Sequence, residues 1–405
     1  MVGHDDGRSF APLRLLAALL LGGFVLAGCE GEEVRPLEPE GGEMFTSYVA
    51  LGNSITAGFQ SGGINDSTQQ ASYAAMVADA MGTEFDLPLM APPGCPPPLV
   101  NAYTGEVVGG EDAPACLGRV TPPPTSLNNV AVPGAAIYDA LHITGEAASP
   151  NELTTFILGG RTQVEAARQA DPTFVSVALG SNDVLDAALT GRTGGITPPS
   201  TFTERYGATL DSLDLADAEG GVLIGVPDVT LIPHLSPGGA YWQAYQQDAF
   251  PPNFFVDGSC APDQQPAPTL VPFGYAFGEL IATAAARPDT TTELDCSADL
   301  EVLVPTEIQT IRQTVASYNA AIQEEASSRD WAYVSLTPTL ESLRAEGRIP
   351  LFPNTSGPEA VSQPFGELFS KDGIHPARPL HRMLAELVIE AINAQYDTSL
   401  SPPGS

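Results

Sequence analysis

Short apolar runs, separated by segments with helical periodicity, are the feature that most constrains how this chain can fold. Residues 174–179 form an apolar run of the kind expected for a strand buried on both faces of a parallel sheet, and residues 221–226 predict a second one. Residues 48–51, 129–132 and 331–336 are further strand candidates. Because strands that alternate with helices build doubly wound sheets, the pattern favours an α/β fold.

Five segments between and after these runs are predicted to be helices. The longest, residues 306–328, repeats apolar residues such as Ile308, Ile311 and Val315 at spacings of three and four, which is typical of one buried helix face. The others are residues 72–81, 162–170, 202–215 and 379–396.

The 405-residue chain is strongly acidic, with 49 Asp and Glu against 16 Lys and Arg and a formal net charge of −33 at pH 7. Binding to nucleic acid and to anionic lipid headgroups depends on Lys and Arg, so this balance argues against both. Hydrophobic residues make up 43% of the chain, which is enough for a sizeable core and argues against disorder.

The first 28 residues have the features of a secretion signal. Arg8 and Arg14 precede an apolar stretch, residues 15–26, that is too short for a membrane-spanning helix of ~20 apolar residues. Leu-Ala-Gly-Cys at residues 26–29 resembles the lipobox of bacterial lipoproteins, which implies that Cys29 is the lipidated first residue of the mature chain. The lipid would hold the chain at the bacterial cell envelope, on a periplasmic or outer-membrane surface. An ordinary signal peptide with an incidental cysteine is the alternative.

Shifts in composition divide the rest of the chain. Residues 29–44 are acidic and contain Pro and Gly, which predicts a solvated tether. The folded domain is expected over residues 45–398, with insertions near 84–126 and 233–300, the second of them a candidate lid or subsite wall. Residues 399–405 are expected to form a flexible tail.

The four cysteines other than Cys29 are expected to form two disulfides, because an even number of cysteines in an oxidising compartment usually pairs. Three pairings can be drawn. Cys95 with Cys116 and Cys260 with Cys296 are favoured, because each pair closes a local, Pro-rich segment. Four free thiols are the alternative.

A serine, an aspartate and a histidine form a candidate catalytic set. Ser54 follows the first predicted strand in a Gly-containing turn, at the end of the sheet where open α/β sheets bind ligands. Asp372 and His375 are three residues apart, so the carboxylate can hold one imidazole nitrogen while the other faces a nucleophile. Each pattern alone is weak, since turn serines and surface Asp–His pairs are common.

Two further motifs follow predicted strands. Gly134 offers a backbone N–H after residues 129–132, and Asn182 offers a side-chain amide after residues 174–179. With the N–H of Ser54 they could form an oxyanion hole, which is usually the largest electrostatic contribution in acyl transfer. A plain turn at Gly134 and a helix cap at Asn182 are the alternatives.

In these ordered blocks the chain resembles the SGNH hydrolase superfamily, also called GDSL esterases and lipases. Gly-Asn-Ser-Ile at residues 52–55 matches the first block, Gly134 the second, Gly-Ser-Asn-Asp at 180–183 the third and Asp-Gly-Ile-His at 372–375 the last. The resemblance implies a flavodoxin-like three-layer α/β/α sandwich with five parallel strands. It also implies a hydrolase that cleaves carboxylic esters through an acyl-enzyme intermediate.

The resemblance assigns a role to each site residue. These roles are nucleophile for Ser54, base for His375, orienting acid for Asp372, and oxyanion donors for Ser54, Gly134 and Asn182. A small-molecule or lipid ester is the expected substrate, and no cofactor or metal is expected. Asn53 departs from the family, which usually has Asp there; this affects the hydrogen bonding of the turn rather than the triad.

Other interpretations stay open at this point. Asp183 and Asp228 follow buried strands and compete with Asp372 as the triad acid. A carbohydrate O-deacetylase or a thioesterase could use the same triad, because fold and triad are shared across substrates. A non-catalytic surface binding lipoprotein and a solute-binding lipoprotein are the candidates from other functional classes.

Two groups of side chains receive structural interpretations. Three histidines of the predicted domain outside the motif lack partners at metal-ligand spacing and are expected on the surface or in the core; they are His142, His234 and His381. The aromatic residues of the second insertion are expected to pack that insertion rather than to line an acyl pocket; they are Tyr241, Trp242, Tyr245, Phe254 and Phe255.

Overall fold

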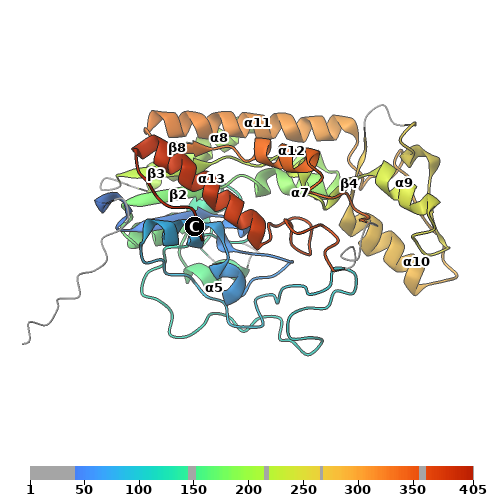
Figure 1. Ribbon diagram of the computed structural model, residues 1–405, viewed down its shortest axis with the longest axis horizontal. Coiled ribbons are helices and arrows are strands. Elements are labelled where there is room, and N and C mark those ends of the chain that lie inside the picture. Colours follow the sequence, from blue (N-terminus) through green and yellow to red (C-terminus); the bar gives the residue numbers. More distant parts are fainter. Residues whose placement is uncertain (1–41, 145–151, 214–218, 265–267, 355–361, 405) are drawn as a thin grey trace, which may run out of the picture. The chain divides into compact units, whose positions relative to one another are not determined.

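A four-stranded parallel sheet forms the centre of the protein (Figure 1). The computed structural model describes residues 42–144, 152–213, 219–264, 268–354 and 362–404. In their order across the sheet, the strands are β1 (Tyr48–Gly52), β2 (Phe174–Ala178), β3 (Gly220–Ile224) and β8 (Ala332–Val334). Each strand coincides with a predicted apolar run, and nearly every residue in them is buried, which confirms the α/β class.

The segment around Asn129 takes the place of a fifth strand beside β1. Ala50 and Asn129 form an isolated parallel bridge, and the Ala50 N–H donates to the Asn128 carbonyl at 2.8 Å. The Asn128 N–H instead donates to Asp86 O at 2.9 Å, while its side-chain amide donates to Tyr48 O, also at 2.9 Å. A side chain thus occupies the carbonyl that a longer ladder would use. The described residues therefore hold four strands and a bridge rather than the five strands expected.

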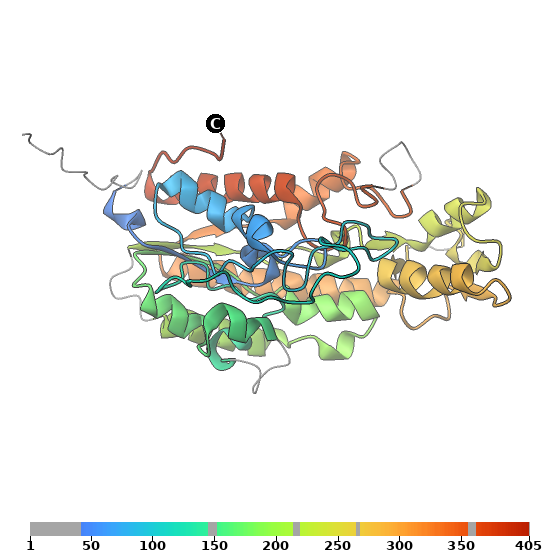
Figure 2. The ribbon, with the colours of Figure 1, turned by 90° about the horizontal axis from the view of Figure 1, so that it is seen from below.

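Helices cover both faces of the sheet, which gives three layers (Figures 1 and 2). One face carries α3 (Tyr73–Met81) and α13 (Arg378–Tyr396), and the other carries α6 (Gln163–Gln169), α7 (Asn182–Thr190), α8 (Pro199–Ser212) and α11 (Pro305–Ser328). Alternate strand residues point to opposite faces: Tyr48 and Ala50 pack with α3 and α13, whereas Val49 and Leu51 pack in the other cluster. The shorter helices are α1 (Ser54–Ala57), α2 (Asp66–Gln70), α4 (Asp139–His142), α5 (Glu152–Leu158) and α12 (Thr337–Ala345).

The longest helix, α11, begins one residue before the predicted segment. Pro305 suits its first position, because the first N–H groups of a helix have no acceptor within it. The Glu307 carboxylate accepts the Val304 N–H at 2.9 Å and so satisfies the backbone at this end. The predicted apolar face is buried, including Ile308, Ile311 and Val315.

The first insertion, residues 84–126, contains no assigned helix or strand. Its backbone is held by two isolated antiparallel bridges, Met90 with Arg119 and Leu99 with Val107. A disulfide joins Cys95 to Cys116, which confirms the predicted pairing. The segment is therefore a long loop, and the disulfide joins its first part to its second.

The second insertion, residues 233–300, contains short helices and strands of its own. Its helices α9 (Gly238–Gln246) and α10 (Ala282–Ala286) lie at one end of the folded domain in Figure 1. Strands β4 (Leu235–Pro237) and β6 (Leu270–Pro272) pair antiparallel, and β5 (Phe254–Val256) and β7 (Thr292–Leu294) pair parallel. Its helices are α9 (Gly238–Gln246), the π-helix η5 (Gly274–Ile281) and α10 (Ala282–Ala286). A disulfide joins Cys260 to Cys296, again as predicted.

Most aromatic residues of this insertion pack against one another. Tyr241 and Phe254 are fully buried, and the Tyr241 ring lies 6.4 Å from Phe250 and 5.8 Å from Phe352. Phe255 is 40% exposed. Packing is thus the observed role of the buried pair.

Removing the second disulfide is expected to destabilise the insertion. Its cysteines are 36 residues apart, and closing a loop of that length contributes roughly 3–4 kcal/mol in the chain-entropy view. A double variant, Cys260→Ser with Cys296→Ser, should lose about that much free energy of unfolding in urea titrations. A reduced but otherwise unchanged protein provides the comparison, and equal stability of variant and parent would contradict the expectation.

The structure describes the C-terminal end of the chain up to residue 404, but not residues 1–41. The predicted secretion signal, Cys29 and most of the predicted tether lie outside the described residues. Leu400, expected in a flexible tail, is instead 3% exposed, and the Asn393 side chain bonds both its N–H and its carbonyl, at 2.8 and 3.0 Å. Among the described helices, none has the length and apolar character needed to cross a membrane.

Candidate active site

Three segments that are far apart in the sequence meet at the carboxyl edge of the sheet. Ser54 begins α1 directly after β1, and Asn182 begins α7 shortly after β2. The segment containing Gly134 contacts the start of α7, because the Asn182 side-chain amide donates to the Ala135 carbonyl at 2.9 Å. The structure therefore links the second and third motifs directly.

The turn that carries Ser54 is tightly built. Asn53 caps α1, with its side-chain oxygen accepting the Ile55 N–H at 3.1 Å. Gly52 has no room for a side chain, because an added Cβ would collide with the side chain of Thr56 as α1 folds back on β1. Ser54 itself is 8% exposed, and its N–H occupies the first helical position, where α1 supplies no acceptor.

Ser54, His375 and Asp372 form one hydrogen-bonded chain. His375 Nε2 lies 2.9 Å from Ser54 Oγ, and His375 Nδ1 lies 2.8 Å from Asp372 Oδ2. Since a carboxylate only accepts, the Nδ1 nitrogen carries the proton and Nε2 is free to accept the serine proton. The centroid of the Phe59 ring lies 5.0 Å from that of the His375 imidazole. The predicted set is thus brought together from both ends of the domain.

The carboxylate of Asp372 is held by backbone and hydroxyl donors. Oδ2 accepts the Gly62 N–H at 2.7 Å, and Oδ1 accepts the N–H groups of Ile374 and His375, each at 2.9 Å, and the Ser370 hydroxyl at 3.0 Å. Burial opposes the charged form, but the positive charge of His375 and these hydrogen bonds outweigh it and hold the pKa of Asp372 below its usual range. The acid stays ionised throughout the pH range in which esterases work.

The two competing acids are engaged elsewhere. Asp228 accepts from Arg312 Nε at 2.9 Å and caps the short turn at Val229–Leu231. Asp183 accepts the Ile137 N–H at 2.9 Å, and burial raises its pKa. Asp372 is therefore the carboxylate that bonds the His375 imidazole.

Gly134 and Asn182, the two further predicted oxyanion donors, lie in segments that one hydrogen bond joins. Gly134 has φ = +82°, a left-handed conformation that favours glycine and turns the backbone after the bridge to β1. Asn182 uses one amide hydrogen on Ala135, which leaves the second hydrogen of its NH₂ group for another acceptor.

The remaining histidines occupy different environments. His142 packs against Tyr138, and His381 is fully buried in α13, where burial and the nearby charge of His375 lower its pKa to about 3. His234, predicted as a surface or core residue, is half-buried and bonds the main-chain carbonyl of Asp372. No cluster of three or more metal-ligating side chains occurs within the described ranges.

Sequence patterns did not single out the residues that hold Asp372. Gly62 lies in the turn after α1, and the Ser61 N–H in the same turn donates to Ser370 Oγ at 2.8 Å. The Ser-Gly-Gly sequence just after the first motif was the available signal. Lys371, the only lysine, directs its ammonium group to the Ser362 carbonyl.

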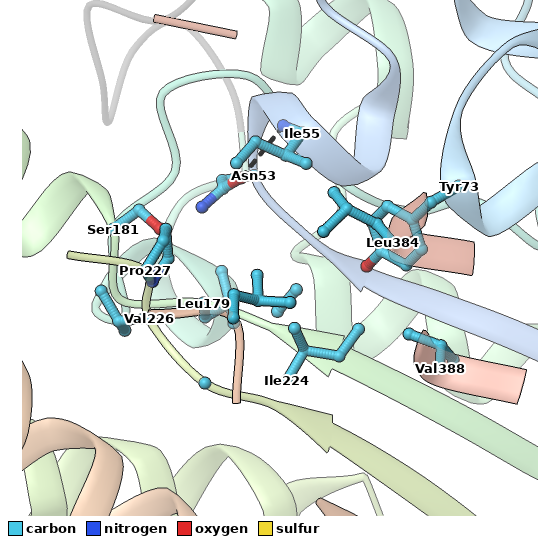
Figure 3. Close-up of a pocket in the computed structure, with 13 residues that line it drawn as sticks. Asn53, Ile55, Tyr73, Leu179, Ser181, Ile224, Val226, Pro227, Leu384 and Val388 are labelled. Carbon is cyan, nitrogen blue, oxygen red and sulfur yellow. Dashed lines mark hydrogen bonds between the residues drawn. The ribbon is translucent and has the colours of Figure 1, made fainter. Parts of the chain in front are cut away.

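An apolar pocket lies beneath the turn that carries Ser54, between the strand ends and helices α3 and α13 (Figure 3). Asn53 and Ser181 face each other at its polar end, while residues such as Ile224 and Leu384 form its walls. Neither Ser54 nor His375 lines it. The pocket therefore belongs to the packing below the turn rather than to the surface that meets an ester.

Comparison with known proteins identifies the family. The family description GDSL-like Lipase/Acylhydrolase matches residues 48–388, and no curated protein matches. Similar solved structures include an extracellular lipase from Streptomyces rimosus, with 15% identity over 85% of this chain and 99% of that chain and a TM-score of 0.38. Another is a variant of an acetyl xylan esterase from Geobacillus stearothermophilus, with 11% identity over 88% of this chain and 96% of that chain and a TM-score of 0.36. Because the family match spans most of its length, the chain belongs to the GDSL-like lipase/acylhydrolase family of hydrolases.

Proposed function

We propose that this protein is a serine ester hydrolase that uses Ser54 as nucleophile, His375 as base and Asp372 as the orienting acid. The observation that carries the proposal is the hydrogen-bonded chain from Ser54 Oγ through both imidazole nitrogens to Asp372, with links of 2.9 and 2.8 Å. A serine hydroxyl is a weak nucleophile until a base can take its proton, and this arrangement supplies that base in the correct tautomer.

The reaction proceeds in two halves. Ser54 Oγ attacks the ester carbonyl and its proton moves to His375 Nε2; His375 then protonates the leaving alcohol, and an acyl-enzyme remains. Water enters, His375 removes its proton, and the hydroxide attacks the acyl carbon; the proton returns to Ser54 as the acid departs. Asp372 accepts from Nδ1 throughout and stabilises the imidazolium.

The negative charge that develops on the carbonyl oxygen requires donors that are already in place. The Ser54 N–H, the Gly134 N–H and the Asn182 side chain are the proposed donors. Their support is the free helix-start position of Ser54 and the bond from Asn182 to Ala135, which holds two of the segments together.

Covalent labelling tests the nucleophile directly. A fluorophosphonate probe should modify the full chain once, and peptide mapping should place the adduct on the peptide that contains Ser54. A lack of labelling, or an adduct on another serine, would refute the proposed nucleophile.

The substrate is proposed to be a neutral ester, because the chain carries a net charge of −33. The field of that charge repels anionic substrates, and salt screens it. We expect p-nitrophenyl butyrate to have a higher kcat/KM than the anionic p-nitrophenyl hemisuccinate, with the ratio shrinking as NaCl rises from 10 to 500 mM. Preference for the anionic ester, or a ratio independent of salt, would contradict this.

The enzyme is proposed to be anchored at the bacterial cell envelope by a lipid on Cys29. The support is the apolar stretch that ends in Leu-Ala-Gly-Cys. Metabolic labelling with an alkyne fatty acid should tag the chain, and Cys29→Ala should abolish the tag. Labelling that survives this substitution would refute the anchor.

A further inference from the structure

The second insertion reaches the catalytic loop through His234. This residue directly precedes β4, and the antiparallel pairing of β4 with β6 brings Phe273 beside it. The Phe273 N–H donates to the His234 carbonyl at 2.8 Å, which extends the pairing of the two strands by one hydrogen bond. This end of the two-stranded sheet contacts the loop that contains Asp372.

His234 bonds two consecutive carbonyls of the catalytic loop. Its backbone N–H donates to Gly373 O at 2.9 Å, and its Nδ1 lies 2.8 Å from Asp372 O. The two carbonyls belong to the two consecutive peptide groups that follow the triad acid, so His234 holds each of these groups by one hydrogen bond. Rotation of either group would break its own bond to His234.

The partners of His234 determine its protonation state. A carbonyl can only accept, so the proton resides on Nδ1; on the other side, the Gly274 N–H points at Nε2 from 3.4 Å, so Nε2 is an acceptor. Both contacts thus suit the neutral imidazole. Burial lowers the pKa of His234 in the same direction, although the charge of Asp372 opposes this and that of His375 adds to it.

An aromatic contact reinforces the same link. The Phe273 ring packs 5.1 Å from Phe365 with the rings nearly perpendicular. Phe365 in turn lies against Gly373, where an added Cβ would come within 2.9 Å of the ring. The insertion therefore touches the catalytic loop by two hydrogen bonds and, through Phe365, by apolar packing.

We propose that His234 is a positioning residue of the esterase, which fixes the main chain of Asp372 through its Nδ1–H and thereby keeps the carboxylate aligned on His375. This inference rests on the proposed function. If the Asp372 carboxylate drifts from His375 Nδ1, it stabilises the His375 imidazolium less. His375 would then lose its proton at lower pH and would be oriented less well towards Ser54. The insertion then supports the chemistry, in addition to any part it has in shaping the substrate site.

A matched pair of substitutions isolates the Nδ1 bond. In His234→Asn the amide nitrogen is as far along the side chain as Nδ1 and can still donate to Asp372 O, whereas in His234→Gln the amide sits one carbon farther out. His234→Phe keeps a flat ring without any donor. His142→Asn is the control at a histidine remote from the catalytic chain of bonds.

The full chain would be assayed with p-nitrophenyl acetate from pH 4 to pH 9, with its fold checked by circular dichroism. We expect His234→Phe and His234→Gln to lose roughly tenfold in kcat with little change in KM, a loss comparable to one hydrogen bond. The acid limb of their kcat/KM profile should move about half a pH unit lower. His234→Asn should keep most of the activity and the original limb, and His142→Asn should match the parent.

Some outcomes would overturn the inference. If His234→Gln and His234→Asn behave alike, in rate and in the acid limb, the Nδ1 bond does not position the acid. If the variants only melt earlier, with an unchanged profile, His234 is purely structural. Absence of esterase activity or of fluorophosphonate labelling in the parent would instead refute the proposed function, so the two failures are distinguishable.

Discussion

Replacing Ser54 by alanine is expected to lower kcat/KM for p-nitrophenyl acetate by roughly 10⁴-fold or more, which corresponds to about 5.5 kcal/mol of transition-state stabilisation. The hydroxyl is the only atom of the residue that bonds His375, at 2.9 Å, and its loss removes the covalent route. The proposed oxyanion donors and the binding surface remain, so a residual rate above that of water is expected and KM should change little.

A second serine provides the control for this substitution. Ser67, in α2, is exposed and bonds its neighbour Asp66 through its N–H, so Ser67→Ala should keep full activity. Thermal unfolding should show that Ser54→Ala remains folded, because its backbone role at the start of α1 does not need the hydroxyl. Esterase activity in Ser54→Ala within tenfold of the parent would mean that another residue is the nucleophile.

The parts of the fold that depend on local patterns could be predicted from the sequence. The runs at residues 174–179 and 221–226, which contain most of β2 and β3, are apolar because both faces of the sheet are covered, and α11 repeats its apolar residues at helical spacing. The disulfides followed from Pro-rich segments that each held two cysteines. Residues 129–132 were predicted to form a strand, but Asn129 forms only an isolated bridge with Ala50. The pairing is limited because Asn128 donates to the carbonyls of Asp86 and Tyr48.

Some residues of the candidate site could likewise be predicted from local patterns, whereas others could not. Asp372 and His375 lie three residues apart, so their contact required no long-range prediction, and the resemblance supplied Ser54. Gly62 and His234 were not singled out from the sequence, because Gly62 acts through its backbone N–H and His234 acts on a backbone carbonyl, across 310 and 138 residues of sequence. Bonds to the main chain leave little residue signature, since almost any residue can supply a backbone N–H or carbonyl.

Replacing Asp372 by asparagine is expected to lower kcat by roughly 10³–10⁴-fold, almost as much as the loss of the nucleophile. The reason is the direction of the hydrogen bonds. His375 Nδ1–H needs an acceptor, and each carboxylate oxygen also accepts at least one backbone N–H, from Gly62 on one side and Ile374 on the other. An amide NH₂ group must face one of these donors, so His375 either turns or adopts the tautomer whose Nε2 carries a proton and cannot act as base.

Asp228 provides the matched control, and the pH dependence of stability separates the acid's two roles. Asp228→Asn loses an ion pair with Arg312 but should keep kcat within a few-fold, since Asp228 does not bond the imidazole.

The folded-state pKa of Asp372 lies below its unfolded value of about 3.9, so its ionisation stabilises the fold above that pH, and this contribution is lost as pH falls from about 4. Urea unfolding of Asp372→Asn should therefore depend less on pH below 4 than that of the parent. A large loss of kcat with unchanged acid sensitivity would mean that Asp372 serves catalysis without stabilising the fold, whereas unchanged kcat would assign the orienting acid to another carboxylate.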